Sequence, residues 1–122
     1  MILVVDDDEI LTDMLQTALE KMGYRVEIAH DGVEAVDHLK HPDCKLMLLD
    51  INMPRVNGME LLILMNAEGI EIPTIVMAGF PDYSMKDFEP FQFVKSFLPK
   101  PFTLHDLSKL VTKEALPGNI TH

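Results

Sequence analysis

The chain has little of what marks nucleic-acid-binding, membrane or disulfide-stabilised proteins. Its 122 residues include one cysteine, no tryptophan, and 10 basic against 20 acidic residues, for a formal net charge of −10. A single cysteine forms no internal disulfide, and binding to phosphate backbones needs clustered lysine and arginine. No apolar run approaches the ~20 residues of a membrane-spanning helix, and we find no signal peptide. We expect a cytoplasmic protein that binds neither nucleic acid nor membrane.

The chain does contain enough apolar material for one core, since 48% of its residues are hydrophobic. Its length suits a single domain, and we find no internal repeat or low-complexity segment. Pro117 and Gly118 end the last helical pattern. We therefore expect one domain over residues 1–116, followed at 117–122 by a tail or the start of a linker.

Five short apolar runs alternate with helical patterns along the sequence. The runs that predict strands are 2–5, 25–29, 45–49, 73–78 and 93–98. The patterns that predict helices are 10–22, 31–40, 58–67, a weak one at 83–89, and one that starts at a Thr103–Asp106 capping box. Regular alternation of strand and helix is typical of an α/β fold with a doubly wound parallel sheet.

Some helical positions carry more specific expectations. Val33 should face inward on the second helix and Leu104 on the last. The helix at 58–67 is apolar almost all the way round, although packing on a sheet requires only one apolar stripe. Ile63 and Leu64 are therefore either ordinary buried residues or a second contact surface.

Charged residues follow three of the predicted strands. Asp6, Asp7 and Asp8 follow the first strand, Asp50 ends the third, and Lys100 follows the fifth. Ligands of open α/β sheets bind outside the carboxyl ends of the strands. If the first and third strands are neighbours, their carboxylates crowd together and repel unless a cation is present, and Mg²⁺ suits hard oxygen ligands. Such a site could hold a phosphoryl group with Asp50 as its nucleophile.

Three motifs in this order carry a resemblance to a known family. They are Val4-Val5-Asp6-Asp7, then Leu48-Leu49-Asp50-Ile51-Asn52-Met53-Pro54 with Gly58, then Leu98-Pro99-Lys100-Pro101-Phe102. The chain resembles, over essentially its whole length, the receiver domain of two-component response regulators. The resemblance implies a CheY-like sheet of order 2-1-3-4-5 flanked by five helices. It also implies a signalling module that catalyses only its own phosphorylation and dephosphorylation.

The resemblance assigns roles to residues of the acidic site. Asp50 would accept a phosphoryl group from a sensor histidine kinase or phosphotransfer protein. Mg²⁺ would be held by Asp50, directly by Asp7, through water by Asp6, and by the backbone carbonyl of Asn52. Lys100 would pair with the phosphoryl oxygens, and its bond to the following proline is often cis in this family.

Two further positions concern the conformational switch of the family. Phe97 fits the aromatic position that changes rotamer on activation. Ala78 stands where the family carries a serine or threonine whose hydroxyl bonds a phosphoryl oxygen. Thr74 lies about 13 Å too far along the strand to replace it, and Ser84 could do so only if the loop folds back. We expect phosphoryl acceptance with an atypical switch.

The sequence leaves several alternatives open. All six phenylalanines fall between residues 80 and 102, either as core or as an exposed face for a homodimer or an effector domain. The chain could be a pseudo-receiver that works by protein contact alone. It could also be a phosphatase of the D-x-D type, although Asn52 replaces the second aspartate and an amide is no general acid.

Structural roles also compete for the same residues. The acidic triplet could serve only as a helix N-cap, Asp50 as a solvated turn residue, and Lys100 as a plain surface lysine. A zinc site at His38, His41 and Cys44 is disfavoured, because the segment crosses a proline and offers no fourth ligand.

Overall fold

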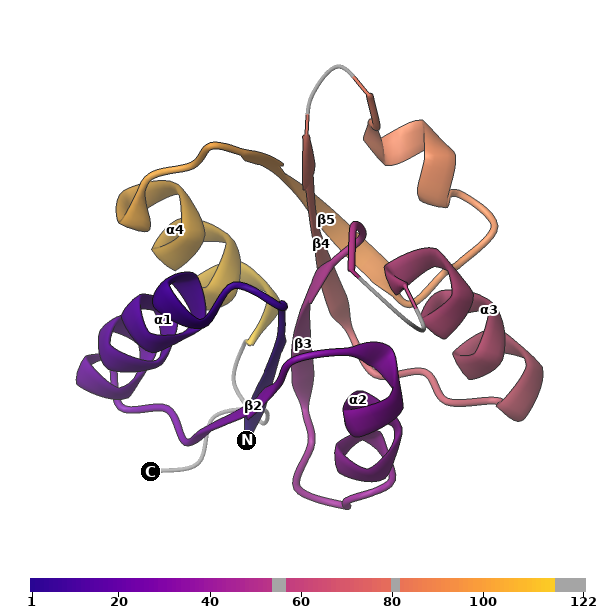
Figure 1. Ribbon diagram of the computed structural model, residues 1–122, viewed down its shortest axis with the longest axis horizontal. Coiled ribbons are helices and arrows are strands. Elements are labelled where there is room, and N and C mark those ends of the chain that lie inside the picture. The colour runs from indigo at the N-terminus through magenta and orange to yellow at the C-terminus, as the bar shows by residue number, and fades with distance from the viewer. Residues whose placement is uncertain (54–56, 80–81, 116–122) are drawn as a thin grey trace.

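A five-stranded parallel sheet forms the centre of the computed structural model, which describes residues 1–53, 57–79 and 82–115 (Figure 1). The strands are β1 (Ile2–Val5), β2 (Val26–Ala29), β3 (Leu46–Asp50), β4 (Thr74–Gly79) and β5 (Val94–Lys100). Their order across the sheet is β2-β1-β3-β4-β5, and every neighbouring pair is parallel. This arrangement confirms the predicted α/β fold and strand order.

Helices cover both faces of the sheet. They are α1 (Glu9–Lys21), α2 (Gly32–Leu39), α3 (Gly58–Glu68) and α4 (Leu104–Glu114). One core lies between the sheet and α1 and α4, and the other lies between the sheet and α2 and α3 (Figure 1). Residues of β1 and β3 point alternately into the two cores, and both strands are buried throughout. Burial on both faces explains why these strands are apolar without interruption.

The prediction of five flanking helices is wrong for the residues that the structure describes, which contain four α-helices. The predicted helix at 83–89 is a single 3₁₀ turn, η1 (Met85–Phe88). The backbone N–H of Asp87 donates to the carbonyl of Ser84 at 3.0 Å, and that of Glu89 to Lys86 at 3.3 Å. Pro90 follows and has no N–H with which to continue the ladder.

Capping side chains fix the helix starts near the carboxyl edge of the sheet. The Asp8 side chain accepts from the backbone N–H of Leu11 at 3.1 Å, so this aspartate is the N-cap of α1. Thr103 and Asp106 form the predicted capping box of α4. Each cap satisfies helix N–H groups that have no partner within the helix.

Burial corrects several expectations about apolar side chains. Val33, expected inward, is 51% exposed, and Leu104 is 45% exposed. Val33 follows Gly32 and so points away from the buried face of α2, which Gly32, Ala35 and Leu39 form. Leu104 is the first residue of α4 and precedes the buried positions Leu107 and Val111. Ile63 is 56% exposed whereas Leu64 is half-buried, so only one of the pair offers a contact surface.

The phenylalanine-rich segment is mainly core. Phe88, Phe91 and Phe93 are buried, and Phe97 and Phe102 are half-buried. Phe80 lies outside the described residues. Of the two alternatives, a core role is therefore confirmed for Phe88, Phe91 and Phe93. A homodimer or effector contact through residues 80–102 stays a prediction, with Phe97 and Phe102 as its partly exposed phenylalanines.

None of the described helices is both long and apolar enough to span a membrane.

Candidate functional site

Three carboxylates meet at the carboxyl edge of the sheet. Asp6 follows β1 and Asp50 ends β3, and these two strands are neighbours with Val5 in register with Leu49. One oxygen each from Asp6, Asp7 and Asp50 lie within 4.8 Å of one another. Asp6 and Asp50 are buried, at 0% and 4% exposure, while Asp7 is exposed. Two acidic groups are thus held out of water, and the third faces it.

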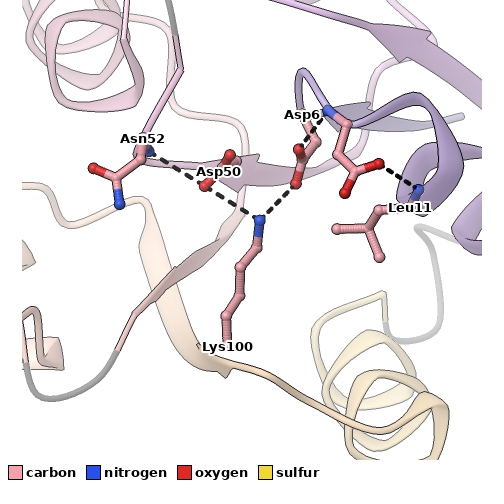
Figure 2. Close-up of polar contacts among 6 residues, drawn as sticks. Asp6, Leu11, Asp50, Asn52 and Lys100 are labelled. Atoms are coloured by element: carbon pink, nitrogen blue, oxygen red, sulfur yellow. Dashed lines mark hydrogen bonds and ion pairs between the residues drawn. The ribbon is translucent and has the colours of Figure 1, made fainter.

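Lys100 brings the opposing charge from the end of β5. Its Nζ lies 2.9 Å from Asp6 Oδ2 and 3.5 Å from Asp50 Oδ1 (Figure 2). Because β4 lies between β3 and β5, the lysine side chain reaches past β4 to contact both aspartates. The bond from Lys100 to Pro101 is cis, as the resemblance implied. The reading of Lys100 as a plain surface lysine is wrong.

Backbone N–H groups orient the two buried carboxylates. The N–H of Asp8 donates to Asp6 Oδ1 at 3.0 Å, and that of Asn52 donates to Asp50 Oδ1 at 3.2 Å (Figure 2). Asp8 is also the N-cap of α1, so the turn that starts this helix also fixes Asp6. The acidic triplet therefore combines the capping role with a place in the site, and Asp50 is no solvated turn residue.

Burial and neighbouring charge set the ionisation of the site. Burial, followed by the negative charge of Asp6, raises the pKa of Asp50 to about 6, against the opposing effects of Lys100 and the Asn52 N–H. For Lys100, burial acts to lower the pKa, but the Asp6 hydrogen bond and the two carboxylate charges outweigh it and raise the pKa. The lysine therefore stays charged, and Asp50 is largely ionised at neutral pH.

The donor set suits a hard divalent cation. Three carboxylates face one lysine charge, so the cluster has excess negative charge when ionised. All the side-chain donors are oxygens, which Mg²⁺ prefers, and the exposed Asp7 leaves the site open to a hydrated ion.

The two positions that the resemblance links to the switch lie on adjacent strands. Ala78 is fully buried in β4, in register with Pro99. Phe97 is half-buried on β5 and stacks on Phe88 with ring centroids 6.2 Å apart.

The hydroxyls of Thr74 and Ser84 do not replace the donor that Ala78 lacks. The Thr74 hydroxyl donates to the carbonyl of Ile72 at 2.9 Å, at the opposite end of β4. Ser84 is exposed at the start of η1.

Sequence reasoning missed two residues beside the site. Tyr83 lines a cavity of about 330 Å³ together with Asp7 and Asn52. Gly58 packs so closely that an added Cβ would lie 2.5 Å from the carbonyl oxygen of Asp50. The only sequence signal for Tyr83 is its hydroxyl, which lies in a segment without a clear helical or strand pattern. Gly58 belongs to the second motif of the resemblance, but the sequence alone does not show its contact with Asp50.

Comparisons with known proteins identify the family. A family model described as the response regulator receiver domain matches residues 2–112. The chain belongs to this receiver family. The receiver domain is 37% identical over 106 residues to the response regulators MprA of Mycobacterium avium and of Mycobacterium tuberculosis strain H37Rv. That match covers 87% of the chain but only 46% of each relative, so the chain spans less than half of their length.

Solved receiver structures share the fold. A CheY-like receiver domain protein from Methanospirillum hungatei superposes with a TM-score of 0.81 at 25% identity, covering 92% of this chain and 90% of that one. TrrA from Thermotoga maritima, solved in complex with Mg²⁺–BeF, gives a TM-score of 0.78 at 26% identity, covering 92% and 96%.

Proposed function

We propose that this receiver domain accepts a phosphoryl group on Asp50 from a phosphohistidine of a sensor histidine kinase or phosphotransfer protein. The observation that carries the proposal is the meeting of Asp6, Asp7, Asp50 and Lys100 at one edge of the sheet. Residues 1–116 would form this domain, with 117–122 as a tail or the start of a linker.

Asp50 would act as the nucleophile. Its pKa of about 6 leaves the carboxylate ionised at neutral pH, and the Asn52 N–H and Lys100 hold one of its oxygens. A carboxylate oxygen bonds to phosphorus while the bond from phosphorus to the imidazole nitrogen breaks, and that nitrogen keeps the electron pair. Lys100 Nζ would then pair with a phosphoryl oxygen and offset the added negative charge.

Mg²⁺ would be held by Asp50, by Asp7 directly, by Asp6 through water, and by the backbone carbonyl of Asn52. When bound, the ion would neutralise charge on the phosphoryl oxygens and relieve repulsion among the carboxylates. The acidic cluster and the Mg²⁺–BeF complex of the related TrrA support this assignment.

The same groups would support hydrolysis of the aspartyl phosphate, so the domain would catalyse only its own phosphorylation and dephosphorylation. The D-x-D phosphatase is a weaker candidate, because Asn52 offers no general acid.

Ala78 makes the switch atypical in this proposal. A ligand shifts a conformational equilibrium only through its different affinity for the two states. A missing charge-assisted hydrogen bond removes about 1.5–3 kcal/mol of that difference. Ala78→Thr should therefore enlarge the structural response to phosphorylation, and an unaltered response would contradict this part of the proposal.

The partner would dock over α1 and the start of α4. A phosphohistidine of the partner must reach Asp50. A cavity of about 410 Å³ lies beside Lys100, and Leu11 also lines it. A second cavity of about 420 Å³ lies between Met14 and Leu104, which are 51% and 45% exposed. A helix of the histidine-bearing partner with an apolar face would fit this surface.

The direct test uses a small phosphodonor. The protein is incubated with Mg²⁺ and acetyl phosphate, and intact mass is measured. We expect one phosphoryl adduct on the wild type and none on Asp50→Asn. The absence of an adduct on the wild type would favour the second candidate, a pseudo-receiver acting by protein contact, for which the missing hydroxyl at Ala78 already speaks.

A further inference from the structure

Tyr83 lies beside the acidic cluster, on the segment that follows β4. It lines the cavity of about 330 Å³ that Asp7 and Asn52 also line. An Asp7 oxygen lies within 4.8 Å of carboxylate oxygens of Asp6 and Asp50. The cavity therefore adjoins the space into which a phosphoryl group on Asp50 would extend.

The backbone and ring of Tyr83 are fixed by the fold. Its backbone N–H donates to the carbonyl of Gly79, the last residue of β4, at 3.1 Å. Its ring is tilted against Phe88, with centroids 6.2 Å apart, and Phe88 is fully buried. Tyr83 is thus a half-buried side chain anchored at the rim of the cavity.

The site lacks the hydroxyl donor that a residue at position 78 would provide, and a phenol can act as such a donor. Ala78 offers no donor to a phosphoryl oxygen, the Thr74 hydroxyl is bonded at the far end of β4, and Ser84 does not line the cavity. A tyrosine hydroxyl is a hydrogen-bond donor to anionic oxygens, and its bond to a charged acceptor is stronger than one between neutral groups. Among the described residues that line this cavity, Tyr83 is the one that carries a hydroxyl.

We propose that the Tyr83 hydroxyl donates a hydrogen bond to the phosphoryl group on Asp50 and replaces the donor that Ala78 lacks. The inference rests on the proposed function and adds to it a phosphoryl-binding residue on a different part of the chain. The Tyr83 ring contacts Phe88, and Phe88 stacks on Phe97. The same hydrogen bond would therefore tie the phosphoryl group to the aromatic switch position of β5.

Beryllofluoride with Mg²⁺ is the probe, since it mimics the phosphoryl group and forms the complex of the related TrrA. The affinity is measured by calorimetry on wild type, Tyr83→Phe and Tyr24→Phe. Tyr83→Phe keeps the ring contact with Phe88 and removes only the hydroxyl. Tyr24→Phe is the matched control, because Tyr24 lines a different cavity with Met1 and Arg25.

We expect Tyr83→Phe to weaken beryllofluoride binding about tenfold, while Tyr24→Phe matches the wild type. Ala78→Thr in the Tyr83→Phe background should restore affinity, because it returns a donor to the site. Equal affinity of Tyr83→Phe and wild type would overturn the inference and leave the proposed function standing. Failure of the wild type to bind the probe or to form an acetyl phosphate adduct would overturn both.

A spectroscopic measurement gives a second readout. The chain has two tyrosines and no tryptophan, so Tyr24→Phe leaves Tyr83 as the sole tyrosine. Adding beryllofluoride and Mg²⁺ to this variant should change the tyrosine emission, and the same addition should leave the emission of Tyr83→Phe unaltered. A change of equal size in both variants would contradict a hydrogen bond from Tyr83.

Discussion

Asp50 is held between burial, which disfavours its charge, and Lys100, which favours it. The outcome is a pKa of about 6 in the folded protein, against an ordinary value of 3.8. Between these two values the folded protein binds more protons than the unfolded chain, so this group's contribution to stability is lost as pH rises through that window. An ionised Asp50 at neutral pH therefore lowers the stability of the folded protein.

The first prediction concerns this cost. Without Mg²⁺, Asp50→Asn should gain about 1–3 kcal/mol in free energy of unfolding relative to wild type as pH rises from about 4 to about 7.5. Urea unfolding in EDTA at the two pH values measures it. The control is Asp37→Asn on the exposed surface of α2, which should show no such trend. A difference between Asp50→Asn and wild type that stays constant with pH would contradict the raised pKa.

The residues of the site differ in how far the sequence revealed them. Asp6, Asp50 and Lys100 were predictable because each ends or follows a strand, and parallel strands bring those ends to one edge. Tyr83 was not predictable, because its place beside Asp7 depends on the path of an irregular segment, for which the sequence carries no period.

The start of α3 packs against the backbone that carries Asp50. Its first residue, Gly58, donates its N–H to the carbonyl of Ile51 at 3.0 Å. An added Cβ would lie 2.5 Å from the carbonyl oxygen of Asp50 and 2.7 Å from the Cα of Ile51. Both contacts are with backbone, which cannot rotate out of the way.

The second prediction follows from this contact. Gly58→Ala should lower the free energy of unfolding by about 1–3 kcal/mol and slow adduct formation from acetyl phosphate, because the strand end that carries Asp50 must move. Denaturant unfolding and intact-mass kinetics measure the two effects. Asn66→Ala, at an exposed position of the same helix, is the control and should change neither. Wild-type behaviour of Gly58→Ala would contradict a close contact between this position and the backbone of Asp50 and Ile51.

The third prediction concerns α1. Met14→Lys should slow phosphoryl transfer from an autophosphorylated sensor kinase at least about tenfold, because it places a charge on the apolar docking surface. The rate with acetyl phosphate should stay unchanged, since the small donor needs no docking. Met22→Lys, a 40% exposed methionine at the other end of the helix, is the matched control. Equal slowing by both variants would place the partner elsewhere.

Element boundaries show where periodicity suffices and where it fails. The α1 helix ends where Gly23 adopts a φ of +98°, and α4 begins at its capping box, both as the sequence indicated. The predicted helix at 83–89 was wrong, because a weak apolar pattern before Pro90 fits a 3₁₀ turn as well as an α-helix. The predicted burial of Leu104 was wrong, because periodicity indicates which face of a helix is inward but not how far along the helix the packing surface extends.

At the scale of the whole molecule, charge is the dominant feature. The net charge of −10 adds general repulsion to the local repulsion at the acidic cluster. Added salt weakens the repulsion among surface charges, whereas it screens the repulsion between the buried Asp6 and Asp50 much less.

The fourth prediction distinguishes binding of Mg²⁺ at the acidic cluster from general screening by salt. Mg²⁺ at about 100 times its dissociation constant should raise the free energy of unfolding by about 2.7 kcal/mol, because it binds the folded state alone. NaCl at the same ionic strength should give a smaller increase. In Asp7→Asn the Mg²⁺ effect should shrink to that of NaCl. Thermal unfolding measures all three, and an undiminished Mg²⁺ effect in Asp7→Asn would contradict the assignment of this residue as a ligand.

The ion pair between Lys100 and Asp6 joins positions 94 residues apart, after the first strand of the sheet and at the end of its last strand. A partly folded intermediate that has docked β1 and β3 but not β5 would already hold the two acids together without their counter-charge. If Asp50 accepts a phosphoryl group as proposed, its reactivity would appear only when β5 docks and brings Lys100 to the two aspartates. During synthesis, the proposed acceptance of a phosphoryl group on Asp50 would then have to wait until β5 had left the ribosome.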